Sequence, residues 1–497
     1  DLLQQLEGME KDPKVQTVLL RIEEFPLGLA AAEETARAIN RLVKAGKSVE
    51  VYLGSAGLKE YLIASPAQKI FLEPAGELRW LGVRSERYFL RGSLDKLGIQ
   101  PEFLAAGKYK SAPEMFMRKD LSEPARTATL DQLRATELAL RTTLQHTREI
   151  TEEKWKQISK LGVLSASEAQ NLGLIEGQAS FTSEIARRET REWIQAWSAP
   201  RRTSLHLPPR ISVVVAQGNI LPSSNRWLRL AGSDGVTPLE MEKKLLIAKK
   251  DPRTEAIILR ISSPGGEVLA SQQIAQRVAD TAKDKALFVS MGDVAASGGY
   301  YIAAPGKRIF ANPMTLTGSI GVFLGKFDFG GLYRWIGLNK EILSDAPYPG
   351  LYSEHRAWSD AEKAVMQRRL GSYYEDFLAH VSKFRSLDEK KTRSVAEGRV
   401  WTGGQANGNG LVDDLGGYYE TVQAVASAQG LSSEEYEIEE IELPIGLMDE
   451  FTPTLFANIS EPTWSLLAPR QPRPALERLS LFRDHPFQYL TPISAPE

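Results

Sequence analysis

A serine surrounded by small residues is the first candidate for chemistry in this sequence. Ser297 lies in GDVAASGGYYIAAP (292–305), where two glycines and two tyrosines follow it. A serine hydroxyl is a weak nucleophile and needs an adjacent base to take its proton. The structural alternative is a small residue that allows a helix to begin in a tightly packed place. The stretch by itself favours this alternative.

Cysteine and histidine offer little as catalytic partners. The chain has no cysteine, which excludes disulfides and thiolate chemistry and disfavours a structural zinc site. Lysine is another base, because removal from water can lower its pKa from about 10.4 to roughly 7–8. A Ser-His-Asp triad has little support, since all five histidines lie outside the glycine-rich loops: His146, His206, His355, His380 and His485.

An internal repeat divides the chain into two similar halves. DPKVQTVLLRI (12–22) matches DPRTEAIILRI (251–261), at an offset of 239 positions (251 − 12). The same offset pairs Gly82 with Gly321, and AQNLGLIEG (169–177) resembles a later stretch, ANGNGLVDD, at nearly the same offset. Matches that keep register over such distances indicate two homologous domains.

Each half has the pattern of an α/β domain. The apolar runs TVLLRI and AIILRI are typical of buried strands, and each is followed by an amphipathic helical stretch and a second strand, VEVYL or ALFVS. This order predicts βαβ units and a mostly parallel sheet. The second half begins with a further strand, ISVVVAQGNI (211–220), which the first half lacks. We therefore expect that a first strand, and potentially a membrane anchor, precedes Asp1.

The length and composition of the chain predict a globular protein with more than one domain. At 497 residues the chain is too long for one ordinary core, and its 42% hydrophobic and 25% charged residues are typical of soluble proteins. The net charge of −2 gives no reason to expect nucleic-acid binding. No uninterrupted apolar run approaches membrane-spanning length. The expected divisions are a first repeat, a linker, a second repeat and a Pro-rich, peripheral or extended tail: 1–197, 198–210, 211–445 and 446–497.

The two copies differ at the candidate nucleophile. Ser297 corresponds to Leu58, and the glycine-rich SSPGG (262–266) corresponds to EEFPL (23–27). Only the second copy therefore carries the serine and a loop whose backbone N–H groups could stabilise an oxyanion. Within that loop and after the serine, Gly265, Gly266 and Gly298 are the candidate donors. A plain tight turn is the structural alternative for the loop glycines.

The first copy carries the complementary groups. It has Lys108 and Lys110 where the second copy has Pro347 and Pro349. Each half thus holds polar residues that the other lacks, as if one ancestral site had been divided between them. This predicts a Ser–Lys dyad with Ser297, although spacing alone does not choose between the two lysines.

Five segments together resemble one family. SSPGGEV, MGDVAASGGYYIAAP, ANPMTLTGSIGVF, GRVWTGGQANGNGLVDDLG and GKYKSAPEMFMRKDLSEPAR are similar to the SppA-type signal peptide peptidases, or protease IV, in their long duplicated form. The resemblance covers nearly the whole chain except the C-terminal tail. It implies an α/β ClpP/crotonase-like fold in each half, a homotetramer, no cofactor or metal, and hydrolysis of hydrophobic peptides such as cleaved signal peptides. It also implies membrane association through a segment absent from this chain, with the catalytic domains on the extracytoplasmic side.

The resemblance assigns roles to individual residues. It makes Ser297 the nucleophile and Lys110 the general base, which leaves Lys108 as a surface charge. Ser319, in LTGSIG, would hydrogen-bond the lysine, with a purely structural hydroxyl as the alternative. Gly298 and either Gly265 or Gly266 would form the oxyanion hole. Tyr300 and Tyr301 are expected in the core or pocket wall, because Tyr61 stands opposite Tyr300 in the copy without the serine.

Two other function classes remain open from the sequence. A crotonase-like acyl-CoA enzyme would share the fold and the paired N–H groups, but such enzymes use carboxylates and the chain shows no convincing basic CoA-binding signature. A non-catalytic scaffold that only assembles and binds peptide is the third class, since half of each site has already been lost.

Overall fold

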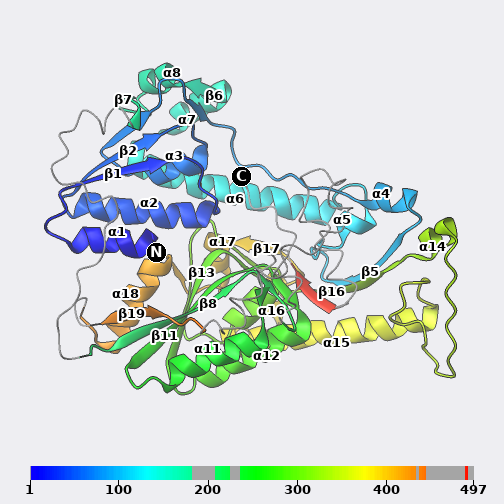
Figure 1. Ribbon diagram of the computed structural model, residues 1–497. Coiled ribbons are helices and arrows are strands. Elements are labelled where there is room, and N and C mark those ends of the chain that lie inside the picture. The colour runs from blue at the N-terminus through cyan, green and yellow to red at the C-terminus, as the bar shows by residue number, and fades with distance from the viewer. Residues whose placement is uncertain (1, 182–206, 224–234, 433–435, 444–486, 491–497) are drawn as a thin grey trace, which may run out of the picture.

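The two repeats lie one above the other in the structure, a computed structural model (Figure 1). Elements of the first repeat, coloured blue to cyan, form the upper body, and those of the second, green to orange, form the lower body. The expected boundaries at residues 197 and 445 and most of the expected linker lie outside the described residues. The structure describes residues 2–181, 207–223, 235–432, 436–443 and 487–490.

The first repeat alternates short strands with helices, as its hydrophobic pattern predicts. Its longest helix is capped by Ser122, whose side chain accepts a hydrogen bond from the Ala125 backbone N–H. In chain order its elements are α1 (Leu2–Lys11), β1 (Thr17–Ile22), α2 (Leu29–Lys44), β2 (Ser48–Leu53), α3 (Leu58–Ala64), β3 (Lys69–Leu72), β4 (Glu77–Arg79), α4 (Arg91–Lys96), β5 (Gln100–Ala106), α5 (Glu114–Met117), α6 (Glu123–Arg148), α7 (Glu152–Leu161), β6 (Val163–Ser165), α8 (Ala166–Asn171) and β7 (Gly177–Gln178).

The second repeat follows a similar order of strands and helices and contains additional elements, among them a strand at its start. Its long helix begins behind a capping box formed by Ser359 and Glu362. Its elements are β8 (Arg210–Gln217), β9 (Asn219–Ile220), β10 (Gly235–Val236), α11 (Pro238–Lys250), β11 (Thr254–Ser263), β12 (Gly265–Glu267), α12 (Val268–Thr281), β13 (Ala286–Ala296), α13 (Gly298–Ala303), β14 (Ile309–Ala311), β15 (Leu316–Gly318), β16 (Val322–Asp328), α14 (Gly330–Ile336), α15 (Asp360–Arg385), α16 (Glu389–Val395), β17 (Val400–Thr402), α17 (Gly403–Asn409), β18 (Asp414–Leu415), α18 (Tyr418–Gln429) and β19 (Glu437–Glu440).

The sheet topology confirms two tandem α/β repeats. The first sheet has the order β1-β2-β3-β7, and the corresponding strands β11, β13, β14 and β18 lie in the same order in the second sheet. The neighbouring pairs in each series are parallel. Helices α6 and α15, which correspond by the repeat, are both 26 residues long. In the second sheet β8 pairs with β11, whereas β1 forms the edge of the described first sheet.

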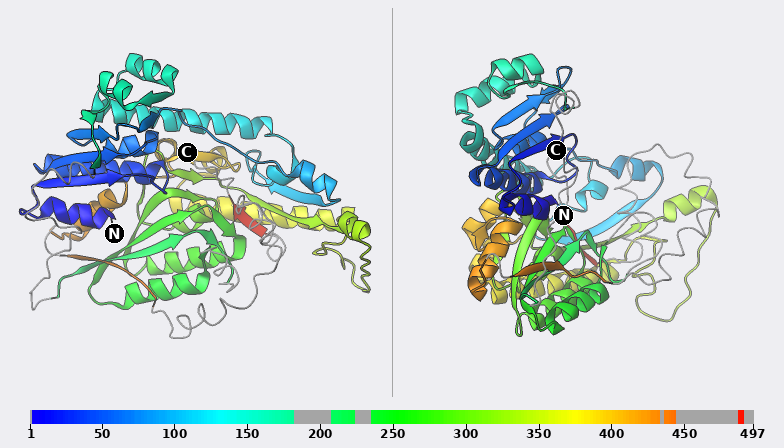
Figure 2. Two further views of the ribbon diagram at one scale, coloured as in Figure 1. Left: turned by 45° about the horizontal axis from the view of Figure 1, so that its top comes forward. Right: turned by 60° about the vertical axis from the view of Figure 1, so that its left-hand side comes forward.

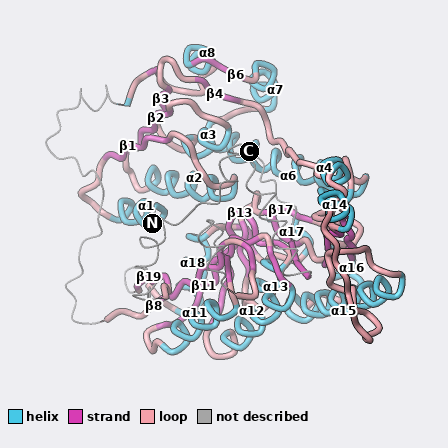
Figure 3. The backbone as a smooth tube through the Cα atoms, turned by 45° about the vertical axis from the view of Figure 1, so that its right-hand side comes forward, coloured by secondary structure: helices cyan, strands magenta, loops and turns pink. Residues whose placement is uncertain are grey.

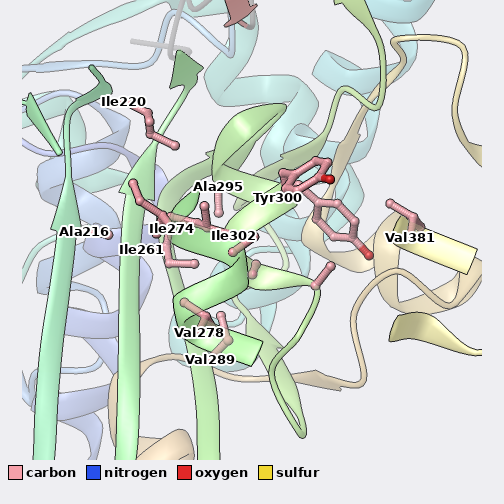
Figure 4. Close-up of a cluster of buried hydrophobic side chains, with 14 of the residues drawn as sticks. Ala216, Ile220, Ile261, Ile274, Val278, Val289, Ala295, Tyr300, Ile302 and Val381 are labelled. Atoms are coloured by element: carbon pink, nitrogen blue, oxygen red, sulfur yellow. The ribbon is translucent and has the colours of Figure 1, made fainter. Parts of the chain in front are cut away.

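Helices cover both faces of the second sheet, which explains its continuous apolar strands. Along β11, Ile257 and Leu259 face the core beneath α11, α12 and α13, whereas Ile258 faces α18 together with Phe288 and Val422. Figure 3 shows these strands lying between α11 and α12 on one side and α2 of the first repeat on the other. Figure 4 shows the larger core, in which the labelled side chains of β11, α12 and α13 converge around Ala295.

One antiparallel strand pair joins the repeats, and Val322 and Leu324 of this pair belong to the larger core. β5 of the first repeat pairs with β16 of the second from Gln100 opposite Asp328 to Ala106 opposite Val322. Phe103 lies beneath this pair, with its ring centroid 5.3 Å from that of Phe327. The two views of Figure 2 show β5 crossing from the upper body onto the lower one. The position at which β5 ends is therefore fixed relative to the second repeat.

The C-terminal tail is described only at Phe487–Leu490, which form strand β20. This strand is extended, but it is not peripheral, because it lies inside the sheet of order β10-β9-β12-β20-β16-β5. It pairs antiparallel with both neighbours. In Figure 1 it is the red arrow beside β16. The rest of the expected tail lies outside the described residues.

The duplication predicts equal roles for two buried tyrosines. Tyr61 donates its hydroxyl hydrogen to the Leu174 carbonyl, and Tyr300 donates to the Leu411 carbonyl, each over 2.8 Å. Replacing either tyrosine by phenylalanine leaves a buried carbonyl without this donor, so each change should lower the free energy of unfolding by about 1–2 kcal/mol. Urea unfolding followed by tryptophan fluorescence measures this loss. A loss in one repeat and none in the other would contradict the equivalence.

Candidate active site

Ser297 occupies the turn between β13 and α13. Its backbone has φ 56° and ψ −117°, a conformation that residues with a side chain rarely adopt. The Ser297 N–H donates to the Gly318 carbonyl over 2.8 Å, which ties the turn to the end of β15. Strained backbone of this kind is concentrated at functional sites, where the surrounding structure holds it in place.

Lys110 reaches Ser297 from the other repeat within the same chain. β5 ends at Ala106, and the following loop brings Lys110 Nζ to 2.7 Å from Ser297 Oγ. The same nitrogen lies 2.9 Å from the Ser319 carbonyl oxygen and 3.1 Å from Ser319 Oγ. Lys108, the competing candidate, is exposed, and its Nζ lies over the Tyr109 ring. The structure thus brings together Ser297, Lys110 and Ser319.

Burial determines the electrostatics of this cluster. Lys110 is 4% exposed, and neither Ser297 nor Ser319 has any exposed surface. Desolvation lowers the pKa of Lys110 well below its usual value of 10.5, because the ammonium form loses its hydration. Among the described residues no carboxylate forms a salt bridge with Lys110 that would restore the charge. Burial therefore shifts the balance towards the neutral amine, which has a free lone pair.

The glycine candidates lie directly beside the serine. Gly298 is the first residue of α13, so its N–H has no acceptor within that helix. A Cβ on Gly298 would lie 2.5 Å from Ser271 Oγ and 3.1 Å from the Gly266 nitrogen, so only glycine fits here. Gly265 has φ 102°, and its N–H donates to Ser263 Oγ over 3.2 Å. The backbone at Gly298 therefore lies directly against the backbone of Gly265 and Gly266.

A segment to which the sequence reasoning gave no role supports both the lysine and the second serine. The Arg399 carbonyl accepts a hydrogen bond from the Ser319 N–H over 2.7 Å. Gly398, at φ 74°, lies so close to the lysine loop that a Cβ there would be 2.6 Å from Lys110 Cβ. The Arg399 guanidinium forms a 3.0 Å ion pair with Asp131 on α6 of the first repeat. The glycine at the start of GRVWTGG was the available signal, since it requires a positive φ.

Asp293, four residues before Ser297, also has a role that sequence reasoning missed. Its carboxylate accepts hydrogen bonds from the backbone N–H groups of Gly28 at 2.8 Å and Ala31 at 3.0 Å. These N–H groups belong to the start of α2 in the first repeat, where an anionic group is stabilised by the helix dipole. The strand that carries Ser297 is therefore anchored directly to the other repeat.

The side chains of Tyr300, Tyr301 and His380 form their own contacts, apart from the cluster of Ser297, Lys110 and Ser319. Tyr300 is buried in the core, as expected, and the Tyr301 ring stacks on His380 at 3.8 Å. His380 Nε2 lies 2.8 Å from the Tyr301 carbonyl oxygen, and burial lowers its pKa to about 4. Among the described histidines none hydrogen-bonds Ser297. His206 and His485 lie outside the described residues.

In the described part of the chain, no helix is long and apolar enough to cross a membrane.

Comparison with known proteins identifies relatives over most of the chain. It is 31% identical to the serine protease SPPA of Arabidopsis thaliana chloroplasts over 82% of this chain and 62% of that protein's length. It is 28% identical to Protease 4 of Haemophilus influenzae over 88% of this chain and 75% of that protein. Among solved structures, a ClpP1 mutant of Listeria monocytogenes matches 42% of this chain and 94% of its own, at 14% identity and a TM-score of 0.27.

The family profile matches both repeats separately. The profile described as Peptidase family S49 matches residues 41–195 and again residues 279–432. These two matches fall on the corresponding parts of the duplicated α/β unit and together cover more than half of the chain. The resemblance inferred from the sequence motifs is confirmed: the chain belongs to peptidase family S49, a family of serine peptidases.

Proposed function

We propose that this chain is an endopeptidase in which Ser297 is the nucleophile and Lys110 its general base. The observation that carries the proposal is the 2.7 Å approach of Lys110 Nζ to Ser297 Oγ in a buried setting. A neutral amine has one lone pair and two N–H groups. The lone pair would accept the serine proton, while the two N–H groups would donate to the carbonyl and hydroxyl oxygens of Ser319. Ser319 then acts as a positioning residue for the base.

Acylation follows from this arrangement. Ser297 Oγ attacks the peptide carbonyl carbon as its proton passes to Lys110 Nζ, and the carbonyl oxygen becomes an oxyanion. The N–H groups of Gly298 and Gly266 would stabilise that charge; Gly265 is less suited because its N–H already donates to Ser263. The C–N bond then breaks, and the Lys110 ammonium returns the proton to the leaving amine. An acyl-enzyme on Ser297 remains.

Deacylation uses the same groups in reverse. The neutral Lys110 takes a proton from water, whose oxygen attacks the ester carbonyl, and the proton then passes to Ser297 Oγ as the ester bond breaks. No histidine or metal is needed for either half of the reaction.

The proposed substrates are hydrophobic peptides, with cleaved signal peptides as the class that the SppA-type resemblance implies. The resemblance also implies a homotetramer and membrane association on the extracytoplasmic side, and we include both in the proposal. Light scattering of the purified protein measures the first, and cell fractionation of the full-length protein measures the second. The active site itself is proposed to form within one chain, so dilution to monomer should not remove the contact between Ser297 and Lys110.

The dyad predicts a matched set of inactive and active variants. Ser297→Ala and Lys110→Ala should each lower kcat/KM on a hydrophobic fluorogenic peptide by at least about a thousandfold, since each removes nucleophile or base. Lys108→Ala, which removes a neighbouring exposed lysine, should retain activity. Covalent labelling of Ser297 by a fluorophosphonate, followed by mass spectrometry, tests the nucleophile directly. Full activity of either dyad variant, or turnover of acyl-CoA without peptide hydrolysis, contradicts the assignment.

The lowered pKa of Lys110 predicts the pH dependence of catalysis. Only the neutral amine accepts the serine proton, so kcat/KM should rise with pH through the lowered pKa of Lys110 and level off well below pH 10.5. Stopped assays from weakly acidic to alkaline pH measure this profile, with Lys108→Ala as the control. A rise that begins only near pH 10.5 would show that Lys110 is charged in the free enzyme and is not a ready base.

Arg399 is predicted to position the base without touching substrate. Arg399→Ala removes the ion pair with Asp131 and loosens the segment that holds Ser319, so kcat should fall by roughly ten- to a hundredfold with little change in KM. Arg399→Lys should restore part of the rate. Arg393→Ala is the matched control, because Arg393 pairs with Glu375 at the surface of the same repeat. Equal effects of Arg399→Ala and Arg393→Ala would refute a specific role.

A further inference from the structure

Strand β20 lies directly against the proposed catalytic elements. Its residues pair with all three residues of β12, and Leu490 is the partner of Gly265, Tyr489 of Gly266 and Gln488 of Glu267. Its other edge pairs with β16, where Gln488 is the partner of Phe323. β20 also contacts α13, the helix that begins directly after Ser297. The C-terminal segment thus touches the glycine loop, the nucleophile helix and the strand that follows Ser319.

β12 and β16 do not pair with each other, and β20 occupies the place of one strand between them. Both strands present backbone N–H and C=O groups to whatever lies between them, and an extended peptide satisfies those groups by adding a strand. β20 itself pairs antiparallel with both strands. Main-chain pairing of this kind gives affinity for extended peptides with little dependence on sequence.

The direction of β20 matches that of a substrate's acyl portion. It runs from Phe487, beside β16, to Leu490, opposite Gly265. In a peptide about to be cleaved, the residues before the attacked carbonyl must run towards the oxyanion donors, as β20 does. The sequence Phe-Gln-Tyr-Leu is uncharged and consists mainly of aromatic and aliphatic residues, the class of peptide that we propose as substrate.

We propose that the C-terminal segment 487–490 is an internal pseudosubstrate that occupies a peptide-binding cleft between β12 and β16 and competes with substrates. This inference rests on the proposed peptidase function. Ser297 has no exposed surface in the state in which β20 is seated, as expected for an occupied cleft. Because the segment is part of the same chain, its local concentration is high and independent of protein concentration. Substrate must displace it before Ser297 can react.

A pair of substitutions at one position tests this competition. Gln488 pairs on both edges, so Gln488→Pro removes a backbone N–H from the centre of β20, whereas Gln488→Ala keeps it. If the segment occupies the cleft about 90% of the time, Gln488→Pro should lower the KM for a hydrophobic peptide by about tenfold with kcat unchanged. Gln488→Ala should behave like the unmodified protein. Deletion of residues 487–497 should reproduce the proline variant.

A second measurement separates occupancy from a structural role. A synthetic peptide of residues 483–497, added to the deletion variant, should inhibit it competitively and restore the higher KM. If β20 is instead a structural strand, Gln488→Pro and the deletion should lower both activity and melting temperature, and the added peptide should not compete with substrate. Either of these results overturns the proposal.

The proposed catalytic function is tested independently in the same set of proteins. One outcome is that Ser297 is labelled by the fluorophosphonate and that peptide turnover is equal in all variants. This outcome would reject the pseudosubstrate proposal and leave the peptidase assignment intact. Absence of labelling and turnover in every variant, including the deletion, would reject the peptidase itself.

Discussion

The pairing of β5 with β16 is the constraint on which the site depends. A lysine in one repeat and a serine in the other lie 187 positions apart (297 − 110), and no local structure could bring them together. Seven consecutive residue pairs fix the end of β5 against the start of β16, and the aromatic cluster around Phe103 packs beneath them. The lysine loop follows one strand and Ser319 precedes the other. A slip in register would therefore separate the base from both serines.

Polar contacts between the repeats support that alignment from the opposite side of the site. Glu34 on α2 forms a two-point ion pair with Arg260 on β11 at 2.8 and 2.9 Å, and it also accepts a hydrogen bond from Asn312. The Asp293 carboxylate holds the start of α2. Buried charges are costly unless they are paired, so these contacts favour one relative placement of the repeats over others. The proposed chemistry of Lys110 requires surroundings without a carboxylate. The paired charges and the Lys110 site therefore lie on different parts of the interface between the repeats.

Much of the fold and part of the site could be predicted from the sequence. The repeat offset and the apolar strands predicted two α/β units, and the contrast between Ser297 and Leu58 marked Ser297 as the candidate nucleophile. Periodicity could not predict that β5 would pair across the repeats, because strand pairing between distant segments depends on three-dimensional packing. For the same reason spacing did not separate Lys108 from Lys110. Their burial separates them in the structure, and the roles of both remain proposals.

Two segments to which the sequence analysis gave no role act through the backbone. Arg399 supports Ser319 through its carbonyl oxygen, a group that every residue carries, so residue type gave no signal. Likewise, Phe487–Leu490 resembled an ordinary part of a Pro-rich tail, and only its pairing with β12 reveals a strand. Main-chain interactions of this kind become visible only when the chain is folded.

The most direct test of the account is a titration of Lys110 itself. Lysine labelled with ¹³C at Cε gives an NMR signal whose shift follows the protonation of Nζ, and comparison with Lys110→Arg assigns that signal. The account predicts that Lys110 titrates well below 10.5, because burial disfavours its ammonium form. A Lys110 signal that titrates near 10.5 would contradict the claim that this lysine is a neutral base held ready beside Ser297.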